Sequence, residues 1–320
     1  MSKATTQYLD PQILAAIGSL ELRARMVIEG MMIGMHRSPF RGFSTEFAEH
    51  RAYASGDDIR HLDWKVFGRT DKLYLKQYQK ETNLRLILLV DASGSMDYGS
   101  GVVPGWRKYD LAATLAAALT YLAIQNQDRV RLALFASDLI TQTSLSNNSG
   151  HWRQIVDALS SVGDLAQRSA DLPDLPEKPD RMTNLARLFD QVTARLTHRS
   201  LVVLISDLFD DPEALQHGLA RLYHRRHDLI VFQTLDHAEL TFPFRSPSEF
   251  VGMEDEGRLN LDPIALRRVY LEAITKHLQT VEQMTRRFHF DYQRVDSSRP
   301  LGPALSAFLA RRSAMIARGK

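Results

Sequence analysis

Residues 86–96 read LILLVDASGSM, in which five apolar residues precede an acidic turn rich in serine and glycine. A continuous apolar run of this length predicts a strand buried on both faces, as in a parallel sheet covered by helices. The strand is expected to end at Asp91, which places the turn at the carboxyl edge of the sheet. Open α/β sheets bind their ligands at that edge, so this turn is the first candidate site.

The chain beyond this stretch alternates apolar runs with helical patterns. Further strands are expected at residues 130–135, 200–205 and 228–235, and helices at 110–124, 150–162, 184–197 and 212–224. A loop is expected over residues 164–181, which hold three prolines. Such alternation predicts an α/β fold with a Rossmann-type, doubly wound and mainly parallel sheet.

The two ends of the chain follow different patterns. A helix over residues 12–33, loops or short irregular strands over 36–58 and a strand over 73–78 predict a small α+β amino-terminal region, residues 1–85. Residues 86–320 form the main predicted domain. Its basic extension starts at about residue 263, with a long helix over 263–288, a strand over 290–295 and a helix over 302–312; two short strands are expected within 249–261.

Composition excludes several classes of protein. The 320 residues include no cysteine, which excludes a disulfide scaffold, a thiolate zinc site and a cysteine nucleophile. The first residues lack the apolar segment of a secretory signal. The longest apolar run, residues 111–124, is shorter than the ~20 residues that a membrane span needs. We therefore expect a cytoplasmic protein.

Charge is unevenly distributed along the chain. Residues 86–263 carry 24 acidic and 16 basic side chains, whereas residues 264–320 carry 4 acidic and 11 basic ones. The acidic middle favours divalent cations or basic partners. The basic tail could contact an acidic surface of a protein, a membrane or a nucleic acid. No aromatic-rich binding signature accompanies the tail, so nucleic-acid binding is the least favoured of these interpretations.

The turn after the first strand offers oxygen ligands for a hard cation. Asp91, Ser93 and Ser95 would lie on one tight turn, in which Gly94 is expected to let the backbone bend sharply. Carboxylate and hydroxyl oxygens suit Mg²⁺ or Mn²⁺ and do not suit zinc. Asp207 ends a later strand and would lie near Asp91 if the two strands are neighbours. Thr183, in a loop just before a helix, could supply a third hydroxyl.

Two alternatives compete with a metal site. Aspartate and serine also occur as ordinary helix caps in a strand-to-helix connection. A Mg²⁺-dependent phosphohydrolase could use Asp91 as its nucleophile, but enzymes of that kind need a second aspartate two residues on, where this chain has Ser93. A serine does not carry out that proton transfer at neutral pH. The chain also lacks a G-x-S-x-G elbow and a phosphate-binding P-loop. The sequence therefore favours a protein that is not an enzyme.

The same five residues carry a resemblance to a known site. In order and spacing, residues 86 to about 236 resemble a von Willebrand factor A domain with its metal-ion-dependent adhesion site. The matching residues are Asp91, Ser93, Ser95, Thr183 and Asp207. The resemblance implies that the three hydroxyls coordinate Mg²⁺ and that the two carboxylates act directly or through water. One coordination position would stay open for an acidic side chain of a partner.

A second motif lies just upstream of this domain. It is similar to the hallmark of the DUF58 family and consists of Arg51, Tyr53, Gly56, Asp57, Asp58, Ile59, Arg60, Asp63 and Trp64. Members of that family are typically paired with MoxR-type AAA+ ATPases, and the resemblance implies a role as their adaptor or co-chaperone, with a possible further protein client. From the residues alone, the segment is interpreted as a loop that ion pairs lock between two domains; a direct partner site is the alternative.

Overall fold

A six-stranded sheet forms the centre of the protein in the computed structural model, which describes residues 10–36, 50–53, 64–76, 84–171, 185–246, 248–253 and 257–318. The strand order is β10-β7-β6-β3-β4-β5. All neighbouring pairs are parallel except the edge pair β4 and β5. The strands are β3 (Arg85–Asp91), β4 (Arg129–Phe135), β5 (Leu139–Gln142), β6 (Leu201–Ser206), β7 (Asp228–Leu235) and β10 (Asp291–Asp296). The predicted doubly wound, mainly parallel fold is confirmed.

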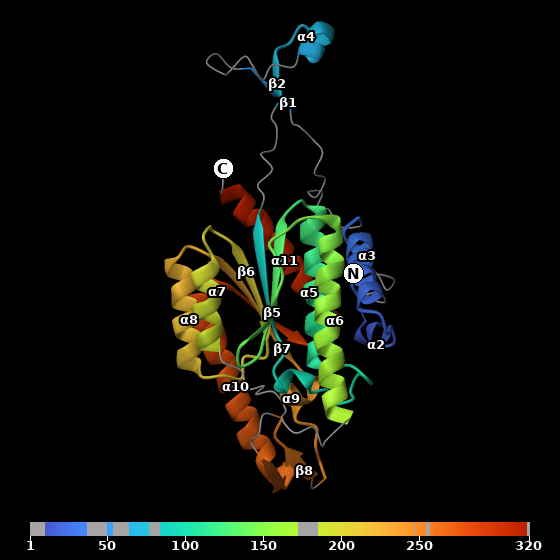
Figure 1. The fold of residues 1–320 in the computed structure, drawn as a ribbon, viewed down its shortest axis with the longest axis vertical. Coiled ribbons are helices and arrows are strands. Elements are labelled where there is room, and N and C mark those ends of the chain that lie inside the picture. Colours follow the sequence, from blue (N-terminus) through green and yellow to red (C-terminus); the bar gives the residue numbers. More distant parts are fainter. Residues whose placement is uncertain are drawn as a thin grey trace.

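Helices cover both faces of this sheet (Figure 1). Successive side chains of β3 belong to the cores on opposite faces of the sheet. Leu86, Leu88 and Val90 belong to one core, and Ile87 and Leu89 belong to the other. The first core includes residues of α5 (Lys108–Gln125), α6 (Ser149–Asp171) and α11 (Gly302–Arg318). The second includes residues of α7 (Leu185–Arg195), α8 (Pro212–His224) and α10 (Pro263–Arg287). Both faces of β3 are buried, as its apolar run predicts.

The amino-terminal helix belongs to the main body. The helix expected over 12–33 is two helices, α2 (Pro11–Ala15) and α3 (Leu20–His36), separated at Gly18 and Ser19. Helix α3 packs on α5, and Leu20, Ala24 and Ile28 are buried in the first core. The domain boundary predicted at residue 85 therefore separates segments that share one hydrophobic core.

The rest of the predicted amino-terminal region forms a smaller unit. Strands β1 (His50–Ala52) and β2 (Tyr74–Lys76) pair in antiparallel fashion, and α4 (Trp64–Thr70) lies between them in sequence. In Figure 1 these elements lie at the end of the molecule opposite α9 (His237–Thr241).

Several elements differ from expectation. Helix α6 continues to Asp171, into the stretch predicted as a loop. Short elements were not predicted: edge strand β5, helix α9 and the 3₁₀ turn η2 (Ser95–Asp97). The two short strands expected within 249–261 correspond to β8 (Ser248–Val251) and β9 (Arg258–Leu261), which pair in antiparallel fashion. In the described part of the chain, no helix combines the length and apolar character that crossing a membrane requires.

Candidate metal centre

The candidate site lies where the winding of the sheet reverses. Strand β3 pairs with β4 on one side and with β6 on the other, so the connections leaving β3 and β6 diverge. This topology brings the turn after Asp91 next to the turn after Ser206. The sequence expectation that Asp207 lies on a neighbouring strand end is confirmed.

Asp91 is completely buried and held at both carboxylate oxygens. Its Oδ1 accepts a hydrogen bond from the Ser93 amide at 2.9 Å, and its Oδ2 accepts one from Ser206 Oγ at 2.5 Å. Burial, reinforced by the negative charge of Asp207, raises the pKa of Asp91 to about 7. The site is therefore one where a cation would stabilise the charged form of this carboxyl.

The two serines of the turn present their hydroxyls to each other. Ser93 Oγ lies 3.0 Å from Ser95 Oγ, and Ser95 begins the 3₁₀ turn η2. The role expected for Gly94 is wrong, because its φ of −59° and ψ of −40° are ordinary helical values that any residue adopts. The bend comes from the 3₁₀ turn and from the Asp91 carboxylate accepting the Ser93 amide.

The turn that carries Asp207 is strained. Leu208 adopts a left-handed conformation with φ of 60°, although it is a buried leucine. Residues held in this region cost roughly 1–3 kcal/mol and gather at functional sites. Ser206 Oγ accepts the Leu208 amide at 3.0 Å, and the Gln233 side chain donates to the Asp207 carbonyl at 2.7 Å. These bonds hold the Asp207 turn in place.

Lys108, which sequence analysis missed, lies in the same site. It is the first residue of α5 and is completely buried. Its Nζ donates to Asp207 Oδ2 at 2.8 Å and to Glu239 Oε1 at 2.7 Å. Burial alone would lower the pKa of this lysine, but Asp207 and Glu239 raise it above its usual value. Lys108 is therefore a fixed positive charge beside the candidate ligands.

The residues present fit a hard divalent cation. Mg²⁺ binds oxygen at ~2.0–2.1 Å in an octahedron, so adjacent ligands lie about 3 Å apart, which matches the 3.0 Å between the two serine hydroxyls. Two carboxylates supply negative charge beside them. Among the residues that the structure describes, no group of three or more carboxylate, imidazole or thiolate side chains could hold a metal. An ion at this edge would therefore depend on the serine hydroxyls.

Other predicted site residues lie elsewhere or outside the described chain. Thr183, Asp57, Asp58, Arg60 and Asp63 fall outside the described residues. Arg51 lies on β1 opposite Leu75, the half-buried Tyr53 donates its amide to the Leu73 carbonyl at 2.9 Å, and Trp64 begins α4. These three belong to the smaller unit at the far end of the molecule from α9 (Figure 1).

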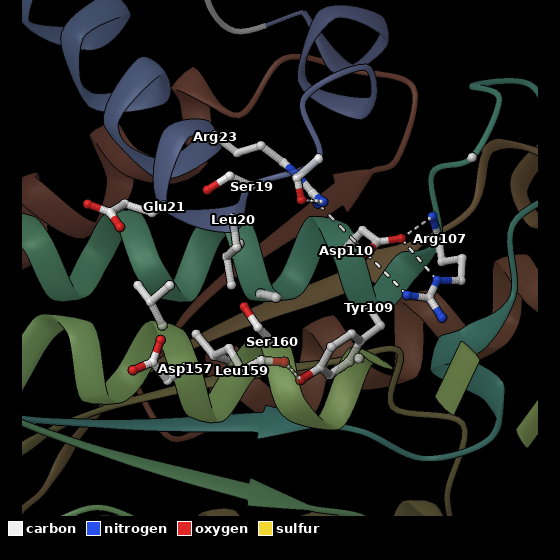
Figure 2. A pocket seen from close by; sticks show the side chains of 15 residues that line it. Ser19, Leu20, Glu21, Arg23, Arg107, Tyr109, Asp110, Asp157, Leu159 and Ser160 are labelled. Carbon is white, nitrogen blue, oxygen red and sulfur yellow. Dashed lines mark hydrogen bonds and ion pairs between the residues drawn. The ribbon is translucent and has the colours of Figure 1, made fainter. Parts of the chain in front are cut away.

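A cavity of about 510 Å³ lies beside the start of α5, between α3 and α6. Figure 2 shows Arg23 of α3 and Arg107 directed toward Asp110. Arg107 Nε lies 3.0 Å from Asp110 Oδ2, and its Nη1 lies 3.5 Å from Asp97 Oδ1 in the turn after Ser95. Both guanidinium groups of this cavity pair with carboxylates, so the network links the turn η2 to α5 and α3.

The fold and the candidate site together define a doubly wound α/β protein with a cluster of carboxylate and hydroxyl oxygens at its switch point. The chain belongs to the DUF58 family, described as "Protein of unknown function DUF58", whose model matches residues 49–280.

Similar proteins occur in two mycobacteria. The uncharacterized proteins Rv1480 of Mycobacterium tuberculosis (strain ATCC 25618 / H37Rv) and Mb1516 of Mycobacterium bovis (strain ATCC BAA-935 / AF2122/97) are each 27% identical to this chain over 282 residues. The aligned part is 87% of this chain and 82% of each relative.

Three solved structures show a weaker likeness. The conserved hypothetical protein BatB of Bacteroides thetaiotaomicron is 18% identical, with a TM-score of 0.45 over 72% of this chain and 99% of that one. An aerotolerance-related membrane protein of Bacteroides fragilis NCTC 9343 is 15% identical, with a TM-score of 0.41 over 70% and 96%. The VWA domain of SpRpn10 is 10% identical, with a TM-score of 0.38 over 70% and 94%.

Proposed function

We propose that the chain is a metal-dependent protein-interaction module. A Mg²⁺ or Mn²⁺ ion would be held by Ser93 and Ser95, with Asp91 and Asp207 acting directly or through water and Thr183 as a third hydroxyl. The observation that supports this most strongly is the 3.0 Å separation of the two serine hydroxyls beside two buried carboxylates. No catalytic turnover is part of the proposal.

The ion would supply a positive charge for a partner carboxylate. Serine hydroxyls are neutral ligands, so an ion held by them keeps much of its charge. Asp91 is buried and held by Ser93 and Ser206, so its place at the site is fixed before an ion binds. A carboxylate arriving at an open position of the ion would form a strong, directional contact in a partly dry environment.

We further propose that the partner is a MoxR-type AAA+ ATPase, for which this chain serves as adaptor or co-chaperone. The support is the resemblance of the segment Arg51–Trp64 to the DUF58 hallmark, together with the family match over residues 49–280. The small unit with β1, β2 and α4 lies at the opposite end of the molecule from α9, which carries Glu239 of the candidate site (Figure 1). The small unit and the ion site would therefore offer separate contact surfaces.

A pull-down with the tagged protein, from an extract of the source cells, tests this proposal. The tagged protein is expected to recover an AAA+ ATPase in Mg²⁺ and to lose it in EDTA, because the contact needs the ion. Ser93→Ala should lose the ATPase as well, while Ser144→Ala, at an exposed serine outside the site, should keep it. The proposal is contradicted if the ATPase is recovered equally well without metal and with Ser93→Ala. It is also contradicted if no ATPase is recovered under any condition.

A further inference from the structure

A buried lysine occupies the candidate ion site together with its carboxylates. The ammonium group of Lys108 bridges Asp207 and Glu239, at 2.8 Å and 2.7 Å. The side chains of Lys108 and Asp207 are each only 1% exposed, and that of Glu239 is 15% exposed. A cation that is already bound to one of the candidate carboxylates repels any second cation that approaches the site.

The position of the ammonium group is fixed from several sides. Its Nζ lies 5.2 Å from the centre of the Phe209 ring and 5.9 Å from that of Tyr98. Glu239 is itself held, because its Oε2 accepts the Asp236 amide at 2.7 Å at the start of α9. Aromatic rings and two carboxylates stabilise the ammonium where it is, so the lysine stays beside Asp207.

We propose that Lys108 is a built-in cation that weakens the binding of a divalent ion at this site by neutralising Asp207. Glu239 moderates the effect, because it shares the ammonium group and adds a negative charge. This inference rests on the proposed function of the site. It makes Lys108 a positioning residue that sets the metal affinity. The ion would be held loosely enough for the fraction of occupied sites to change with the concentration of the ion in solution.

Mn²⁺ titration of purified variants, followed by the electron paramagnetic resonance signal of free Mn²⁺, tests this inference. Lys108→Met removes the repelling charge and should tighten Mn²⁺ binding roughly tenfold or more. Glu239→Gln removes an attracting charge and leaves the ammonium to Asp207 alone, so it should weaken binding several-fold. Glutamine keeps a side-chain oxygen for the Asp236 amide. A purely structural role of the pair would not move the affinity in opposite directions.

A double variant covers the case in which Lys108→Met does not fold, since that change leaves two buried carboxylates unpaired. Lys108→Met combined with Glu239→Gln removes one positive and one negative charge, so it leaves one buried carboxylate, that of Asp207, without the ammonium group instead of two. It should bind Mn²⁺ roughly tenfold more tightly than Glu239→Gln alone, because the two proteins differ only in the lysine.

The outcomes separate this inference from the proposed function. Equal or weaker Mn²⁺ binding after removal of Lys108, with binding by the unchanged protein, overturns the inference alone. No Mn²⁺ binding by any of these proteins overturns the metal site and the inference with it. Binding by the lysine variants but not by the unchanged protein supports the inference and contradicts the metal-dependent part of the proposed function.

Discussion

Arg312→Met is expected to lower the free energy of unfolding by about 3–5 kcal/mol, because removing one partner of a buried ion pair leaves an uncompensated charge. Arg312 of α11 is paired with Asp128 in the turn between α5 and β4, at 2.5 Å between Nε and Oδ2. The Asp128 side chain is fully buried, and its other oxygen accepts only the Leu84 amide at 3.3 Å among the bonds described. Burial raises the pKa of this carboxyl even with the arginine present.

Urea denaturation measures this loss, with Arg299→Met as the matched control. Arg299 pairs with Asp296 at 3.5 Å, but its side chain is 78% exposed. An exposed pair contributes about 0–1 kcal/mol, so the control should change little. Adding Asp128→Asn to Arg312→Met should recover part of the stability. A loss no greater than that of Arg299→Met would show that this pair does not hold α11 to the body.

Asp91→Asn is expected to weaken Mg²⁺ binding roughly 100-fold, about 2.7 kcal/mol, because it removes a buried negative charge beside the hydroxyl ligands. Asparagine keeps the size of the side chain and an oxygen that accepts the Ser93 amide. Its amide group would meet Ser206 Oγ, which can accept a hydrogen bond as well as donate one. The fold should therefore survive the change.

Isothermal titration with Mg²⁺ measures the affinity, and circular dichroism during thermal unfolding checks the fold. Asp138→Asn removes a carboxylate from an exposed position outside the site and should leave Mg²⁺ binding as it is. If Asp91→Asn binds Mg²⁺ as well as Asp138→Asn does, the carboxylate at the end of β3 is not part of an ion site.

The sequence predicts the central strands of the sheet well because almost all of their residues are buried and therefore apolar. The apolar runs that became β3, β6 and β7 are buried along nearly their whole length, so their pattern is unambiguous. Strand β5, LITQ, is short and partly exposed at the edge, and it carries no such signal. Helix α9 has five residues and depends on its cap at Asp236, which reads from sequence as an ordinary loop residue.

The candidate site was predicted only in part, for a physical reason. Asp91, Ser93 and Ser95 are adjacent in sequence, so their pattern is visible without a structure. Lys108 was missed because the helix was expected to start at residue 110, which left the lysine outside it. Its partner Glu239 is 131 residues away in sequence, and only the fold brings the two together. Gly94 was assigned a conformational role that its backbone angles do not need.

Anomalous diffraction from a crystal of the full chain soaked in Mn²⁺ tests the central claim most directly. One strong anomalous peak is expected at the carboxyl edge of the sheet, from an ion bound by the hydroxyls of Ser93 and Ser95 next to Asp91. The same peak should vanish when an excess of Mg²⁺ replaces Mn²⁺ in the soak, because both ions would use these oxygens. A crystal with no peak at this edge, or with a peak only at other side chains, would show that these residues do not form a metal site.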